Sequence, residues 1–143
     1  MTTTHQETGG CLCGAYRYAF DRQAVLSAAH CHCTDCQRVT GSGKATIVFL
    51  PTAALEAKGT LKSYTVVGSD GSHVERLFCD TCGSPVLSRV IEQPDLIFVK
   101  AGSLDDSSWV NPAMSFWARS ALPWDAVADG VPAVPGNPPA PTA

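Results

Sequence analysis

The residues of this 143-residue sequence with the most evident chemistry are seven cysteines, which fall into three short clusters. The clusters are Cys11-Leu12-Cys13, Cys31-His32-Cys33-Thr34-Asp35-Cys36 and Cys79-Asp80-Thr81-Cys82. An odd number of cysteines, divided as two, three and two, does not suit a framework of disulfides. A C-x-C or C-x-x-C step places two thiolates on one side of a tight turn, where a tetrahedral zinc ion needs its sulfur ligands. The spacing therefore favours metal binding.

The first and last pairs predict a structural zinc ion held by Cys11, Cys13, Cys79 and Cys82. Two pairs that lie far apart in the sequence can complete one four-thiolate site. Each pair is followed at once by a glycine, which lets the backbone turn sharply and direct N–H groups at sulfur. Spacing alone would also allow the central cluster to join either pair, and buried cysteines without a metal are the plainer alternative.

The central triplet predicts a second metal, bound by Cys31, Cys33 and Cys36. In an extended segment Cys31 and Cys33 point the same way while His32 points away, and Cys36 returns after a short turn. Three protein ligands leave one position for water or substrate, as in catalytic zinc sites, and a soft thiol is a natural fourth ligand. The alternative is a site closed by a fourth protein ligand, such as Asp35, His30 or His32.

The segment Cys33-Thr34-Asp35-Cys36 is formally also a redox C-x-x-C motif. Nothing around it resembles the strand-to-helix setting in which such a motif lowers a thiol pKa and exchanges disulfides. Metal binding is therefore the favoured interpretation of this segment as well.

Length and composition bound the remaining possibilities. The chain is the size of one domain, and 45% hydrophobic with 16% charged residues is typical of a globular protein. A net charge of −3 with scattered basic residues argues against a duplex nucleic acid as partner. The sequence shows no signal peptide and no apolar run of the roughly 20 residues that a membrane span needs. Clustered thiols then predict a reducing compartment, the cytoplasm.

The elements that must position the cysteines are predicted to be mainly strands. Tyr16, Tyr18 and Phe20 alternate with Arg17 and Ala19, which indicates a strand buried on one face. Residues 1–9 are expected to form a flexible arm and residues 131–143 a Pro-rich disordered tail. Only residues 51–57 suggest a helical turn, after a proline. Further strands are expected over residues 25–30, 44–50, 61–67, 73–78, 85–90, 96–101 and 114–119.

Several of these stretches resemble one family, the glutathione-dependent formaldehyde-activating enzymes, which carry the CENP-V/GFA domain and an Mss4-like fold. The matching residues are Gly10-Cys11-Leu12-Cys13-Gly14, residues 31–38 with Thr40-Gly41-Ser42, and residues 78–85. Residues 101–106 and the Leu122-Pro123-Trp124 sequence extend the match. Together they follow the order expected for the family over about residues 9–130.

The resemblance implies a small two-sheet β fold stapled by zinc, with the domain spanning residues 10–130. It implies that the four outer cysteines hold a structural zinc and that the central triplet holds a second, catalytic zinc, two ions per chain. The activity it implies is the condensation of formaldehyde with glutathione to S-(hydroxymethyl)glutathione, a carbon–sulfur lyase chemistry. The implied partners are a small thiol and an aldehyde.

The sequence departs from this family ahead of its Pro-Trp dipeptide. Ser115 and Ala121 stand where the family often has a histidine and a lysine, so the sequence does not specify the thiol substrate. Arg38, which follows the triplet, could bind a substrate carboxylate through two parallel hydrogen bonds from its guanidinium group. Lys44 is a weaker candidate for the same role. Aromatic residues near the end of the domain could wall a pocket, although an ordinary core is the plainer explanation: Trp109, Phe116, Trp117 and Trp124.

Two other functions compete with a thiol-and-aldehyde enzyme. The first is a non-catalytic zinc-stabilised β domain that binds a protein partner, in which both metal sites would be closed. The second is a methionine sulfoxide reductase of the zinc-bearing β type. That enzyme needs a catalytic cysteine outside the metal pairs, and this sequence has no isolated cysteine.

Overall fold

The structure is a computed structural model that describes residues 5–138 of the chain. The chain is mainly β, its strands fall into two sheets, and the prediction of a mainly β, two-sheet fold is confirmed. Within the described residues it forms two compact units. Unit 1 contains residues 5–27 and 48–110, and unit 2 contains residues 28–47 and 111–138. Each unit holds one of the cysteine groups.

Unit 1 contains a small antiparallel sheet with the strand order β1-β2-β5. Its strands are β1 (Gln6–Gly10), β2 (Arg17–Asp21) and β5 (Glu56–Lys58). Tyr18 and Phe20 are buried while Arg17 is exposed, as the alternation along β2 predicts. Strand β1 occupies part of the expected N-terminal arm, and the first four residues of that arm lie outside the described residues.

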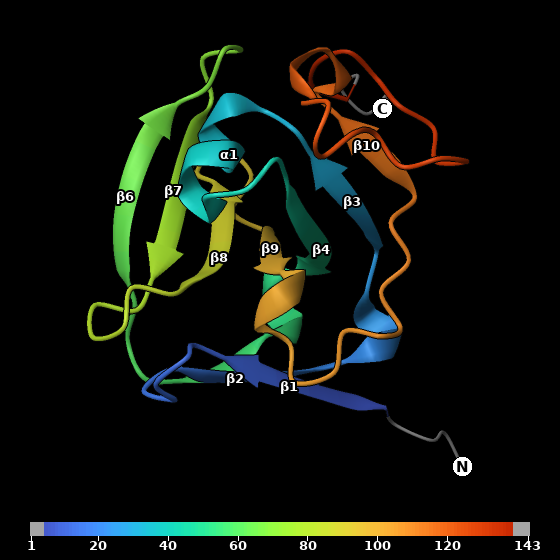
Figure 1. The fold of residues 1–143 in the computed structure, drawn as a ribbon. Coiled ribbons are helices and arrows are strands. Elements are labelled where there is room, and N and C mark those ends of the chain that lie inside the picture. Colours follow the sequence, from blue (N-terminus) through green and yellow to red (C-terminus); the bar gives the residue numbers. More distant parts are fainter. Residues whose placement is uncertain (1–4, 139–143) are drawn as a thin grey trace. The chain divides into compact units, whose positions relative to one another are not determined.

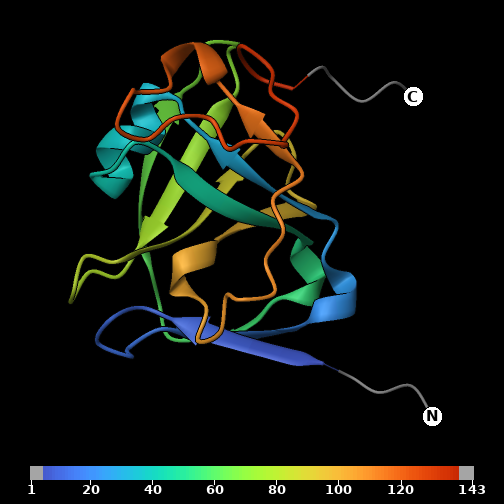
Figure 2. The ribbon, with the colours of Figure 1, turned by 45° about the vertical axis from the view of Figure 1, so that its right-hand side comes forward.

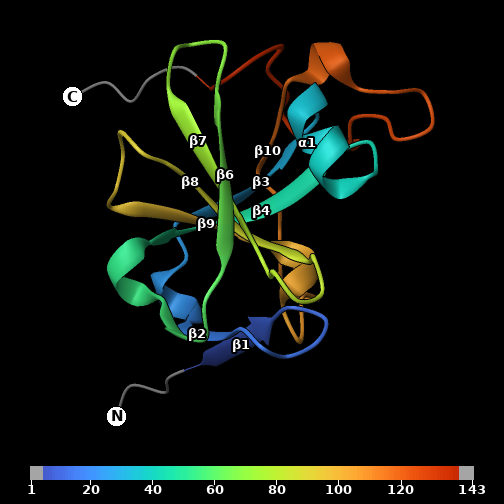
Figure 3. The same cartoon turned by 90° about the vertical axis from the view of Figure 1, so that its left-hand side faces the viewer.

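The rest of unit 1 is an antiparallel run of neighbouring strands in the order β9-β8-β7-β6 (Figure 3). The strands are β6 (Lys62–Val67), β7 (His73–Phe78), β8 (Pro85–Val90) and β9 (Leu96–Lys100). Val86, Leu87, Ile97 and Val99 are buried and form much of the core of this unit. Short 3-10 turns lie at η1 (Arg22–Ala24), η2 (Thr52–Ala54) and η3 (Ala101–Ser103).

Unit 2 contains β3 (Ser27–Cys31), helix α1 (Thr34–Thr40), the first part of β4 (Ala45–Pro51), β10 (Met114–Phe116) and the turn η4 (Ala118–Ser120) (Figure 1). Strand β10 pairs with β3 in parallel, and β3 neighbours β4. The sequence analysis was wrong in expecting helical character only after Pro51, because α1 is the one α-helix of the described residues.

The Pro-rich end of the described chain lies along β10 in unit 2 (Figure 2). Ser115 donates its backbone N–H to Pro132 at 2.9 Å and accepts one from Val134 at 3.0 Å. Trp117 donates its backbone N–H to Gly136 at 3.0 Å, and its indole N–H donates to Asn137 at 2.7 Å. The expected tail thus begins with a stretch that extends the β10 edge, while residues 139–143 lie outside the described part of the chain.

Among the described residues, no helix is both long and apolar enough to cross a membrane.

Candidate functional site

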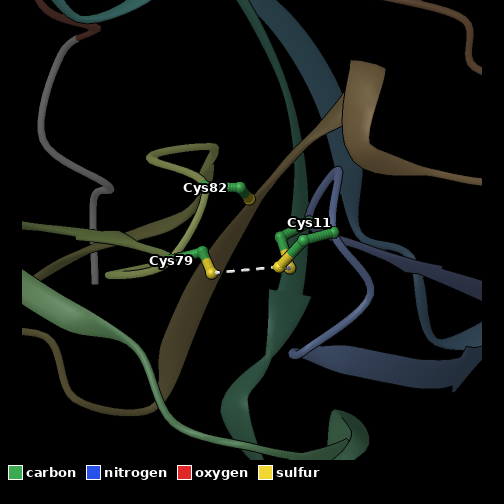
Figure 4. A group of neighbouring side chains, drawn as sticks. Cys11, Cys79 and Cys82 are labelled. Atoms are coloured by element: carbon green, nitrogen blue, oxygen red, sulfur yellow. Dashed lines mark hydrogen bonds between the residues drawn. The ribbon is translucent and has the colours of Figure 1, made fainter.

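The four outer cysteines come together in unit 1. Cys11 and Cys13 lie in the turn after β1, and Cys79 and Cys82 lie in the turn between β7 and β8. Their ligand atoms all lie within 4.8 Å of one another. Figure 4 shows the sulfurs of Cys11, Cys79 and Cys82 directed from two separate loops toward a common region.

The sulfur separations in this cluster fit a tetrahedral ion. The Sγ atoms of Cys11 and Cys13 are 3.6 Å apart, and those of Cys13 and Cys79 are 3.7 Å apart. A regular tetrahedron with Zn–S bonds of about 2.3 Å has edges of about 3.8 Å. A disulfide would need a separation of about 2.05 Å, and none of the seven cysteines forms one.

Two glycines shape the turns of this cluster. Gly14 and Gly83 have φ angles of 81° and 78°, a region that side chains other than glycine rarely adopt. Their N–H groups donate to the carbonyls of Cys11 and Cys79, at 3.2 and 2.8 Å. The turned backbone also directs N–H groups at sulfur, for example that of Thr81 at Cys79 Sγ over 3.4 Å. Such donors offset the negative charge of a thiolate.

The thiols of this cluster differ in acidity without a metal. A backbone N–H lowers the pKa of Cys11, and the hydroxyl and N–H of Ser84 lower the pKa of Cys82 to about 5. For Cys13 the N–H of Ala15 acts to lower the pKa, but desolvation and the neighbouring thiols outweigh it and raise the pKa to about 12. Crowded thiols therefore cannot all ionise alone, and a bound cation would resolve the conflict. The donor set fits zinc.

The central triplet lies in unit 2, where β3 passes into α1. Cys31 ends β3, Cys33 is the N-cap residue of α1, and Cys36 lies in the first helical turn. Their sulfurs also lie within 4.8 Å of one another. The N–H of Cys36 donates to the Sγ of Cys33 at 3.2 Å, so a thiol takes the capping role that a serine or aspartate usually fills. The helix ends at Gly41 with a φ of 67°.

Mutual contact and burial also affect the acidity of the triplet thiols. Contacts with Cys33 and Cys36, together with burial, raise the pKa of Cys31 far above the ordinary thiol value. For Cys33 the contact with Cys31 acts to lower the pKa, but Cys36 and burial outweigh it and the pKa is raised. Three neutral thiols would hold a soft cation only by releasing their protons, so we expect binding at this position to depend on pH. The donor set again suits zinc.

No histidine or carboxylate of the described residues joins the triplet as a fourth ligand. Asp35 is exposed in α1. His30 uses its Nδ1 in a 2.8 Å hydrogen bond with Thr46 Oγ1. His32 is fully buried and neither ring nitrogen has a hydrogen-bond partner. The group that the structure assembles therefore offers three sulfur ligands and one open position.

The remaining residues singled out in the sequence lie at different places. Arg38 is exposed in the last turn of α1. Lys44 forms an ion pair with Asp125, with Nζ and Oδ1 2.9 Å apart. Ser115 is fully buried in β10.

Trp109 lies in unit 1, where its ring packs edge-on against Phe20. In unit 2, Trp117 packs under Arg119, and Trp124 is 68% exposed.

Sequence reasoning missed Gln37, which holds the segment carrying the triplet. Its Nε2 donates to the carbonyl oxygens of His32 and Ser120, both at 2.9 Å. It therefore ties the residue between Cys31 and Cys33 to the turn η4. Gln37 lies within the matching stretch 31–38, but no motif indicates this role, because its partners are backbone atoms that meet only in the folded unit.

Comparison with known proteins points to one family. The family model described as "Glutathione-dependent formaldehyde-activating enzyme" matches residues 6–120. The chain is also similar to the crystal structure of a Rhodobacter sphaeroides protein, a structural genomics target, with a TM-score of 0.54 and 25% sequence identity. That similarity covers 73% of this chain and 91% of the other. No curated protein gives a significant match.

Proposed function

The chain belongs to the family of glutathione-dependent formaldehyde-activating enzymes, and on that basis we propose that it is a zinc-dependent enzyme of the carbon–sulfur lyase type. In the proposed reaction a thiol such as glutathione adds to a small aldehyde such as formaldehyde, or the product reverts to them. Seven cysteines that form no disulfide suit a reducing compartment, so we place this activity in the cytoplasm.

The observation that carries the proposal is the triplet with its open position. Cys31, Cys33 and Cys36 bring three sulfurs within 4.8 Å, and no histidine or carboxylate among the described residues completes the set. A structural site would be closed by a fourth protein ligand, as the first cluster is. A zinc ion bound by the triplet would supply a coordination position that lowers the pKa of an incoming thiol.

The residues of unit 2 would act mainly by positioning. Three thiolates around a divalent cation leave a net charge of about −1, so strong activation of the aldehyde oxygen is not expected there. The helix cap at Cys33 and the two hydrogen bonds of Gln37 fix the backbone that carries the triplet. A thiolate held at this position would be close to a bound aldehyde, and proximity would supply most of the rate.

The bond changes of the proposed step are simple. The thiol loses its proton to solvent, its sulfur forms a bond with the carbonyl carbon, and the π electrons of the carbonyl move to oxygen. The oxygen then takes a proton and becomes the hydroxyl group of an S-hydroxyalkyl product. The reverse reaction breaks the same C–S bond. No residue is assigned as the proton donor.

Arg38 is the proposed contact for a carboxylate of the thiol substrate. It is exposed on the helix that carries Cys36, and no ion pair joins it to an acidic group in the described part of the chain. Lys44 is less available, because Asp125 already neutralises it. Ser115, which stands where the family often has a histidine, is buried and does not offer a basic group. Recognition of the thiol therefore falls to Arg38.

The test is the rate at which formaldehyde and glutathione exchange with S-(hydroxymethyl)glutathione, measured by NMR exchange spectroscopy against the uncatalysed rate. We expect the zinc-loaded protein to accelerate exchange and Cys36→Ser to abolish the acceleration. Arg38→Ala should raise the KM for glutathione roughly tenfold, the effect of losing one charge-assisted hydrogen bond. It should leave the reaction of 2-mercaptoethanol, which has no carboxylate, unchanged.

The same preparation distinguishes the enzyme from a protein-binding domain. Native mass spectrometry should find two zinc ions per chain, one of them easily chelated and protected by added thiol. A protein that holds both ions equally tightly, ignores thiols and exchanges no faster than buffer is a non-catalytic zinc-stabilised domain, and the proposal is then wrong.

A further inference from the structure

His32 lies between two residues of the triplet but takes no part in it. Its side chain is 0% exposed, and neither Nδ1 nor Nε2 has a hydrogen-bond partner among the described residues. The backbone of Gly43 lies near the ring, yet the contact does not have the geometry of a hydrogen bond. A buried imidazole with two unpaired nitrogens is unusual, because buried polar groups in native proteins are almost always bonded to protein or to ordered water.

Ser115 is a second buried polar side chain in the same position of the sheet. It is also 0% exposed, and its Oγ has no partner. Ser115 is in register with His30 across the parallel pair of β10 and β3, so the two side chains share a face. His32 is two residues beyond His30, and its N–H continues the pairing by donating to the carbonyl of Phe116 at 2.9 Å. Alternation places His32 on that face as well.

The other polar groups near this face already have partners. His30 is bonded to Thr46, and Lys44 is paired with Asp125. Among the described residues of unit 2, the buried side-chain atoms without a partner are those of His32 and Ser115. An imidazole ring presents at least one N–H donor, and its other nitrogen can also take part in a hydrogen bond. A serine hydroxyl also both donates and accepts.

We propose that His32 and Ser115 form a buried binding site for ordered water behind the cysteine triplet. Water matches the atoms to be bonded, because it can donate to one ring nitrogen or to Ser115 and accept from the other. Water also brings no charge into a site whose side chains are fully buried, whereas an ion there would need a partner of opposite charge. Internal waters of this kind make about three hydrogen bonds and are costly to remove.

This site would make His32 a positioning residue. The carbonyl of His32 is already held by Gln37, and the water would hold its ring, so both ends of the residue between Cys31 and Cys33 would be fixed. The positions of the Cys31 and Cys33 sulfurs would then be restricted by the fixed position of His32. This inference rests on the burial and pairing of His32 and Ser115 and is independent of the proposed reaction.

The direct test is a high-resolution crystal structure of the full chain as purified, supported by water-to-protein NOE measurements. We expect a water within hydrogen-bonding distance of a His32 ring nitrogen and of Ser115 Oγ, and its loss in Ser115→Ala. A ring whose two nitrogens are bonded to protein atoms, with no water beside it, would overturn the proposal. Ser115→Ala changes only a hydroxyl, so it keeps the test open even where His32 variants do not fold.

A double-mutant cycle provides an independent test. His32→Phe and Ser115→Ala each leave a shared water with fewer partners, so the double variant should be less destabilised than the sum of the singles. The expected coupling is on the order of fivefold in the unfolding equilibrium constant. The matched control pairs His32→Phe with Ser103→Ala, whose hydroxyl has its own partners in Tyr18 and Lys100, and should be additive. Additive behaviour in both cycles would contradict the shared water.

Discussion

The cross-link between the two outer cysteine pairs should carry a measurable share of the stability of unit 1. Cys13 of the first pair and Cys79 of the last pair are 66 positions apart in the sequence. Closing a loop of that length in the unfolded chain costs about 4 kcal/mol of conformational free energy, which a metal cross-link removes. Cys79→Ser/Cys82→Ser deletes one arm and should lower the free energy of unfolding by about that amount. Domains of this kind are stable by only about 5–15 kcal/mol.

The triplet provides the matched control for this prediction. Cys31 and Cys36 are only five positions apart, so a metal there closes a far shorter loop. The logarithmic dependence on loop length makes its entropic share about 2 kcal/mol smaller. We therefore expect Cys31→Ser/Cys33→Ser to cost clearly less stability than the variant in the outer pairs.

The assay is urea unfolding of the zinc-loaded proteins, followed by far-UV circular dichroism and tryptophan fluorescence. Trp109 lies in unit 1 and packs against Phe20, so its fluorescence reports on that unit. Equal losses of stability in the two double variants, or an unchanged midpoint for the outer-pair variant, would refute the reasoning. A chelator that removes both ions should lower the stability of the wild type by at least as much as the outer-pair substitution does.

Two further substitutions test the packing around the sites. Arg17 and Thr8 lower the pKa of Asp105 to about 2, so its contribution to stability is complete above pH 3.8 and is lost as the pH falls toward 2. Asp105→Asn should cost about 1 kcal/mol or less at pH 7, because its ion pair with Arg17 is half exposed. The urea midpoints of the wild type and this variant should converge as the pH falls, and a difference that stays constant with pH would contradict the prediction. Gly43→Ala would place a Cβ 2.4 Å from the Cβ of Asp125 and should cost about 1–3 kcal/mol in thermal unfolding, whereas Gly102→Ala, with no atom nearby, should be neutral.

The predictable parts of the fold are those where side-chain type and period agree. The predicted bounds for His73–Phe78 and Pro85–Val90 match β7 and β8 at both ends. Each strand carries two β-branched or aromatic residues and is bounded by turn residues, which favours a single local interpretation. The grouping of the cysteines was predictable because cysteines two or three positions apart stay close in space whichever turn joins them.

Strand β1 could not be predicted because its residues are poor strand formers. Its sequence, Gln6–Gly10, ends in two glycines and carries a glutamate on its buried face. The strand exists because of tertiary contacts. Glu7 is buried but paired with Arg22 at 2.6 and 2.9 Å, and a Cβ on Gly9 would lie 2.3 Å from the Tyr18 hydroxyl. The glycine is needed for close approach, which no local pattern reveals.

Helix α1 was missed for a different reason. The alternating Cys31-His32-Cys33 pattern indicates an extended chain, and β3 does continue as far as Cys31. The change to a helix occurs at Cys33, whose thiol serves as the N-cap. Cysteine is not among the residues that mark helix starts, so only Gly41 at the other end signalled a boundary. A seven-residue helix is also too short to show a helical period.

The different chain separations within the two cysteine groups assign them different tasks. A site built from residues 66 positions apart cannot form before unit 1 is folded, so its ligands and the fold depend on each other. The triplet is assembled within one strand end and one helical turn, held by the cap of Cys33 and the hydrogen bonds of Gln37. Its geometry is therefore largely local, so a metal held there could leave, exchange or accept a thiol without unfolding unit 1. That separation is what a reactive site needs, because an ion on which a fold depends cannot also offer a readily exchangeable position.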